Sequence, residues 1–126
     1  MGLFGFGGPS EQDILMETSL AFSREIKKSK DCKKAFLKLR EEIEKFMSEH
    51  CPDTLESGWH TKGDTMHDSL TSDPKDKDQR TDIKIYLMES IYYIKESKYR
   101  GNADKLPSLN DMISEYFDSS LFEGLK

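Results

Sequence analysis

The segment from Ile83 to Ile94, IKIYLMESIYYI, carries apolar residues around most of the circumference of an α-helix. Leu87 and Ile91 share one helical face with the two ends of the segment, and neighbouring tyrosine, isoleucine and methionine residues widen that face on both flanks. Isoleucine and tyrosine also favour strands, but the segment has no period of two, so we predict a helix. Such a helix needs neighbours on several sides, and the rest of the chain must supply them.

Two segments before it show a single apolar stripe at helical spacing. The first, residues 10–29, begins with Ser10 as N-cap and Asp13 three residues later as its capping-box partner. The second, residues 31–50, begins with Asp31 as N-cap. We therefore expect two amphipathic helices in the N-terminal half.

The outer faces of the second helix are charged. Pairs of opposite charge lie four residues apart, a spacing that stabilises an exposed helical surface. The pairs are Lys38 with Glu42, Arg40 with Glu44, and Glu41 with Lys45. The sequence thus predicts a solvated surface for all six side chains.

The central helix and a last helix complete the predicted bundle. A Pro at position 74 can start a helix, and Gly101 can end one, so the central helix is expected over residues 74–99. Ser108 caps a narrow apolar stripe over residues 108–122, which we expect to pack beside the central helix. The predicted fold is an all-α bundle of about four helices, a single domain over residues 10–126.

An alternative joins the first two helices into one. Leu15, Phe22, Phe36 and Ile43 keep the same heptad phase, and neither Gly nor Pro interrupts the chain between them. A continuous helix over residues 10–50 would pair with a second copy or a partner as a coiled coil, which makes a homo-oligomer the alternative assembly.

Residues 52–73 are rich in turn-forming residues, and we predict an irregular insertion between the second helix and the central one. Trp59 indicates some order, because a free loop gains little by holding an indole in water. A short helical turn over residues 65–70 is the alternative for part of this segment.

Composition limits the classes of protein and partner. The chain has 126 residues, 34% of them charged, with a net charge of -5 and a mean hydropathy of -0.74. An acidic balance argues against general binding to nucleic acid. Two cysteines make no disulfide framework, and no apolar run approaches the roughly 20 residues of a membrane span, so we expect a cytoplasmic protein.

One cluster has residue types that bind metals. His50, Cys51, His60 and His67 fall close together in sequence, and zinc accepts both imidazole and thiolate ligands. Their spacing matches neither paired CxxC elements nor HExxH. Zinc is therefore the one cofactor that the sequence suggests, with unconnected surface residues as the alternative. Cys32, outside the cluster, is expected to be a buried apolar residue.

Residues 1–9, MGLFGFGGP, form a glycine-rich arm with three large apolar residues, Leu3, Phe4 and Phe6. The composition favours docking of these side chains on the protein's own core or on a partner. The letters GLFG also resemble the start of some viral fusion peptides, which implies shallow insertion into a membrane surface as an alternative.

A basic segment surrounds the junction of the first two helices. Its lysines are Lys27, Lys28, Lys30, Lys33 and Lys34. The last two lie near the positive end of a helix dipole, where cations cost stability, so the charge points to an external partner. The alternative is a solvated turn.

No P-loop, GxSxG motif or dinucleotide fingerprint is present in the sequence, and no residues suggest catalysis. We predict a non-enzymatic module that binds a protein partner through the arm, the basic segment and Trp59. A zinc protein and a peripheral membrane protein are the alternatives.

Overall fold

The computed structural model describes residues 10–96, and every structural statement below applies to that range. The predicted arm at residues 1–9 and the predicted helix at residues 108–122 lie outside the described residues. The elements are α1 (Glu11–Ser29), α2 (Cys32–His50), α3 (Pro52–Thr54), η2 (Leu55–Trp59), α4 (His60–Ser69) and α5 (Lys77–Glu96). Residues 10–96 contain no strand, and the predicted all-α class is confirmed.

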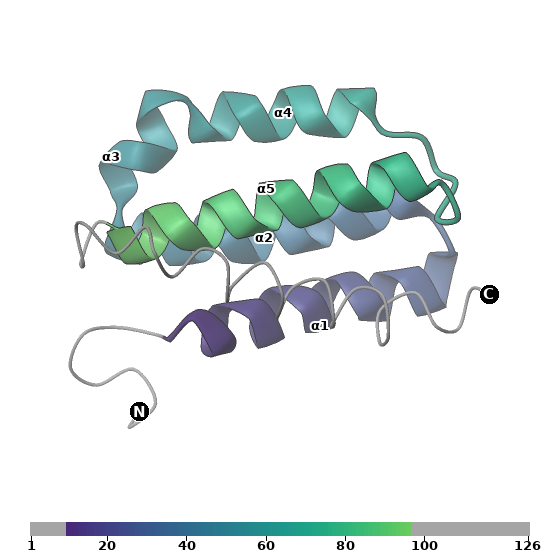
Figure 1. Ribbon diagram of the computed structural model, residues 1–126, viewed down its shortest axis with the longest axis horizontal. Coiled ribbons are helices and arrows are strands. Elements are labelled where there is room, and N and C mark those ends of the chain that lie inside the picture. The colour runs from purple at the N-terminus through teal and green to yellow at the C-terminus, as the bar shows by residue number, and fades with distance from the viewer. Residues whose placement is uncertain (1–9, 97–126) are drawn as a thin grey trace.

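The helices form a bundle in which α5 runs alongside α2, in front of it in Figure 1, with α1 on one side of this pair and α4 on the other. Following the chain in Figure 1, α1 and α4 run in one direction and α2 and α5 in the opposite one. The junction of α1 and α2 therefore lies at the same end of the bundle as the start of α5.

Helix α1 begins as predicted. The Ser10 hydroxyl accepts a hydrogen bond from the Asp13 backbone N–H at 3.1 Å, and the Asp13 carboxylate accepts one from the Ser10 N–H at 3.1 Å. This capping box satisfies two backbone donors that a helix start leaves open.

The alternative of one continuous helix over residues 10–50 is wrong. Lys30 is in the left-handed region with φ 54°, and its N–H donates to the Ile26 carbonyl at 2.9 Å. Asp31 then accepts a hydrogen bond from the Lys34 N–H at 3.1 Å and starts α2. Left-handed backbone ends a helix even where the heptad phase continues, so the two helices fold back on each other.

The irregular insertion predicted for residues 52–73 is wrong for residues 52–69, which are helical. Pro52 stands at the start of α3, where its missing N–H costs no hydrogen bond. Gly58, with φ 155°, bends the path before α4 and lets the buried Trp59 turn inward. Few apolar residues anchor this segment, so its helical period was not visible in the sequence.

Helix α5 begins three residues later than predicted. The Asp73 carboxylate accepts a hydrogen bond from the Lys75 N–H at 2.9 Å and forms a tight turn. This turn lies just before the first residue of α5, Lys77. Asp76 is the effective cap, since one carboxylate oxygen accepts the backbone N–H groups of Asp78 at 2.9 Å and Gln79 at 3.2 Å.

The predicted buried face of α5 is confirmed, but the helix is not enclosed all round by the described residues. Its inward positions are almost fully buried, and they are Ile83, Leu87, Ile91 and Ile94. Ile85 and Tyr93 are 45% and 42% exposed, respectively. The described elements thus bury the inward stripe of α5 and leave Ile85 and Tyr93 partly uncovered.

Candidate functional site

The lysines of the predicted basic segment gather around the α1–α2 turn, and we call this group the basic corner. It comprises Lys27, Lys28, Lys30, Lys33 and Lys34. All are exposed except the half-buried Lys33. None forms an ion pair with a residue in the range 10–96. Their charges are therefore not neutralised by direct contacts within the described fold.

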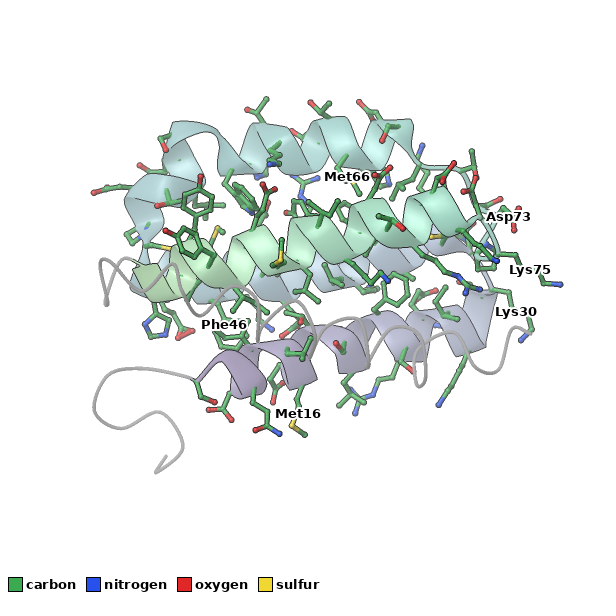
Figure 2. All side chains as sticks on the ribbon, in the orientation of Figure 1. Met16, Lys30, Phe46, Met66, Asp73 and Lys75 are labelled. Atoms are coloured by element: carbon green, nitrogen blue, oxygen red, sulfur yellow. The ribbon has the colours of Figure 1, made fainter. Side chains whose placement is uncertain are left out.

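The connection between α4 and α5 adds to this end of the bundle. The Cys32 N–H donates to the Ser72 carbonyl at 2.9 Å, which holds that connection against the start of α2. Figure 2 shows Lys30, Asp73 and Lys75 at this end. The aspartates here accept backbone N–H groups at the caps described above, whereas the lysines project outward. The sequence alone did not place Lys75 beside the basic corner.

The four predicted zinc ligands do not come together. Cys51 is buried at the end of α2, His50 is half-buried beside it, and His60 is exposed at the start of α4. His67 pairs instead with Asp68, with 3.9 Å between Nδ1 and Oδ1. Within the described range no three His, Cys, Asp or Glu side chains form a group that would hold a metal ion.

Both cysteines are buried thiols. Burial raises the pKa of Cys51, although a hydrogen bond with Thr54 acts in the opposite direction. Burial likewise raises the pKa of the Cys32 thiol to about 11, and the prediction that Cys32 is a buried apolar residue is confirmed. Burial thus favours the protonated form of both thiols over the thiolate.

Trp59 is a core residue in this structure. Its indole is only 6% exposed and stacks on Tyr86, with ring centroids 5.3 Å apart. Tyr93 lies 5.2 Å away by the same measure, and the Lys62 ammonium stands 4.8 Å from the indole centroid. Little of the indole remains for a partner, so the ring serves mainly to hold η2 and α4 against α5.

The sequence missed an ionic cluster around a buried arginine, because it placed Arg40 on the exposed face of α2. Arg40 is only 8% exposed. Its Nε donates to Glu44 at 3.0 Å, and its Nη2 lies 2.7 Å from the Asp64 carboxylate and donates to the His60 carbonyl at 3.1 Å. The His60 ring also contacts Glu44, with 3.0 Å between Nδ1 and Oε2. We call these four residues the Arg40 cluster.

Gly63 of α4 packs directly against the Arg40 side chain. A methyl group added at Gly63 would lie 2.6 Å from the Arg40 Nε, so the Arg40 side chain would have to shift to admit it. Burial alone would lower the pKa of Arg40, but hydrogen bonds and charge from Glu44 and Asp64 outweigh it, and the pKa is raised. The Arg40 hydrogen bond in turn lowers the pKa of Asp64. The Arg40 cluster thus ties α2 to α4 through the guanidinium of Arg40.

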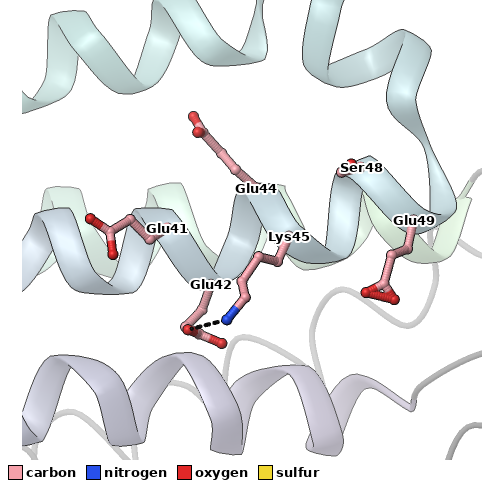
Figure 3. A pocket seen from close by; sticks show the side chains of 6 residues that line it. All are labelled: Glu41, Glu42, Glu44, Lys45, Ser48 and Glu49. Carbon is pink, nitrogen blue, oxygen red and sulfur yellow. Dashed lines mark hydrogen bonds and ion pairs between the residues drawn. The ribbon is translucent and has the colours of Figure 1, made fainter.

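The outer face of α2 carries an open, mostly acidic hollow (Figure 3). It is lined by Glu41, Glu42, Glu44, Lys45, Ser48 and Glu49. The Lys45 ammonium pairs with Glu42 at 3.1 Å, in place of the predicted pair with Glu41. Figure 3 shows the other labelled side chains of this hollow apart from one another. Among the side chains drawn there, no acid and base converge on a common point. We assign no catalytic role to this surface.

Comparison with known proteins adds no assignment. No protein-family model, curated protein or solved structure matches the chain. In the described range no helix is long and apolar enough to cross a membrane. The predicted contact residues Leu3, Phe4 and Phe6 lie outside the described residues.

Proposed function

We propose that this protein is a non-enzymatic interaction module whose basic corner binds an acidic surface of a protein partner, in the cytoplasm. The observation that supports this proposal is the group of five lysines without ion pairs in the described range. Neighbouring aspartates cap backbone groups there, and the lysine ammonium groups stay open to contacts from outside.

A protein surface suits this arrangement better than a long nucleic acid. The chain is acidic overall, with a net charge of -5, and would repel an extended polyanion outside the corner. Five clustered charges act mainly on the rate of encounter and on the choice of partner. Each exposed ion pair adds only about 0.2 to 1 kcal/mol, so the complex should be sensitive to salt.

The test is capture of partners by the immobilised full chain, followed by quantitative mass spectrometry. The corner variant is Lys30→Glu with Lys33→Glu, and the matched control is Lys38→Glu with Lys45→Glu, which makes the same change in net charge on α2. We expect an acidic partner whose capture falls several-fold in the corner variant and at raised salt, and which the control retains.

The proposal fails if the corner variant and the control lose the same proteins to the same extent. It also fails if every captured protein is indifferent to salt. Far-ultraviolet circular dichroism of both variants checks that the helices are intact.

A further inference from the structure

Two hollows on the outside of α1 and α2 join into one surface. The acidic hollow of α2 shares Glu41 and Glu42 with a second hollow, which lies between α1 and α2. The second hollow is lined in addition by Ala21, Arg24, Glu25, Lys28 and Lys38. Figure 3 shows α2 in front of α5, so this surface faces away from α5. We call the two hollows together the α1–α2 face.

The half of the α1–α2 face that is nearer the α1–α2 turn is basic. Its cations are Arg24 and Lys28 of α1 and Lys38 of α2, and Glu25 lies beside them. All three cations are exposed. None of them forms an ion pair with a residue in the range 10–96. This half therefore carries positive charge that the described fold does not neutralise by direct contact.

From the middle of α2 onward, the face is acidic. Two of its carboxylates, those of Glu42 and Glu44, already have basic partners. The other two, those of Glu41 and Glu49, are exposed and form no ion pair with any residue from 10 to 96. The α1–α2 face thus has unpaired cations in one half and unpaired carboxylates in the other.

Exposed apolar side chains of α1 lie beside the middle of this face. Met16, Leu20, Arg24 and Lys28 follow one another at four-residue steps, so they lie along one side of α1. Met16 and Leu20 are 49% and 48% exposed, and Leu20 is the middle residue of the helix. An apolar centre with a charged rim is the usual composition of a protein interface.

We propose that two copies of this chain associate through the α1–α2 face, related by a two-fold axis that crosses α1 and α2 near their middles. The helices of the two copies then run in opposite directions, and the basic half of each copy lies over the acidic half of the other. A two-fold axis makes every such contact twice, so a surface with both signs is complementary to itself. The same axis brings Leu20 of one copy close to Leu20 of the other.

A second copy fits this surface better than a partner of one sign. An anionic membrane or a polyanion would be attracted to the basic half and repelled by the acidic half. The net charge of -5 on each copy opposes association, but salt screens it beyond about 8 Å at physiological ionic strength, whereas the paired charges are in contact. The proposal does not depend on what the basic corner binds, since only Lys28 of that group lines the two hollows.

Charge reversal in the full chain tests the proposal. Arg24→Glu with Lys28→Glu makes both halves of the face acidic, and Glu41→Lys with Glu49→Lys makes both halves basic. Sedimentation velocity over a series of protein concentrations measures the dimer. We expect the unaltered chain to dimerise as concentration rises and each double variant to do so several-fold more weakly. An equal mixture of the two variants should restore the dimer as a heterodimer, which native mass spectrometry identifies by its mass.

The matched control is Lys75→Glu with Lys77→Glu, which makes the same change in net charge as the first variant, but at the start of α5. It should dimerise like the unaltered chain. An unaltered chain that stays monomeric up to millimolar concentration would overturn the proposal, as would an equal loss of dimer in the control. Absence of the heterodimer from the mixture would also overturn it. A misfolded variant cannot imitate this rescue, because mixing does not refold it.

Discussion

At the scale of single residues, the Arg40 cluster shows how position in a helix can mislead. The spacing of Arg40 and Glu44 is that of an ordinary surface pair, and their ion pair does form. A second helix then covers the guanidinium, and Asp64 supplies a second carboxylate from outside α2. The pairing was predictable from spacing, whereas the burial depended on where α4 packs.

Gly63 offers the sharpest test of this cluster. In an isolated helix Gly63→Ala should stabilise by about 1 kcal/mol, because alanine is the better helix former. Here the new methyl group would meet the Arg40 side chain, and overpacking costs about 1 to 3 kcal/mol, so we expect a net loss near 1 kcal/mol. Urea unfolding measures this difference.

The control for that substitution is the same change made in an Arg40→Ala background. Without the guanidinium the methyl group has room, and Gly63→Ala should now stabilise by about 1 kcal/mol. A loss of stability in both backgrounds would show that Gly63 is required for a reason other than its contact with Arg40.

At the scale of elements, the α1–α2 turn was only partly predictable. The N-caps at Ser10 and Asp31 follow from residue type and spacing, and both form as expected. The left-handed conformation of Lys30 does not follow from residue type. Lysine has no preference for this conformation, and glycine is the usual residue at such a position. Packing of α1 against α2 imposes this conformation.

Lys30→Gly should therefore stabilise the protein. Left-handed backbone costs a residue with a Cβ atom about 1 to 2 kcal/mol, and glycine avoids that cost while losing some entropy on folding. We expect a gain near 1 kcal/mol in urea or thermal unfolding. Lys28→Gly, inside α1, removes the same charge and should lose about 1 kcal/mol. Equal losses for both variants would argue that the turn is not strained.

At the scale of the whole molecule, predictability followed the strength of the apolar pattern. Helices α1, α2 and α5 carry long periodic stripes, and their positions were recovered within a few residues. Helix α4 has little apolar surface, and Trp59 and the ionic contacts of Arg40 hold it in place. Contacts between distant segments, which no local pattern records, therefore decide the structure of residues 52–69 and the burial of Arg40.

This difference in anchoring predicts unequal stability across the bundle. Helix α4 rests on charged contacts and few apolar ones, so its amides should exchange with deuterium faster than the core amides of α2. Arg40→Ala should speed exchange in residues 60–69 several-fold and leave α1 nearly unchanged, because it removes the contacts of Arg40 with α4 without opening the α1–α2 core. Hydrogen exchange with mass spectrometry on the full chain resolves these segments. Lys38→Ala, on the exposed face of α2, is the control and should change exchange neither in residues 60–69 nor in α1. An equal rise throughout the chain after Arg40→Ala would mean instead that α4 and the other helices unfold as one unit.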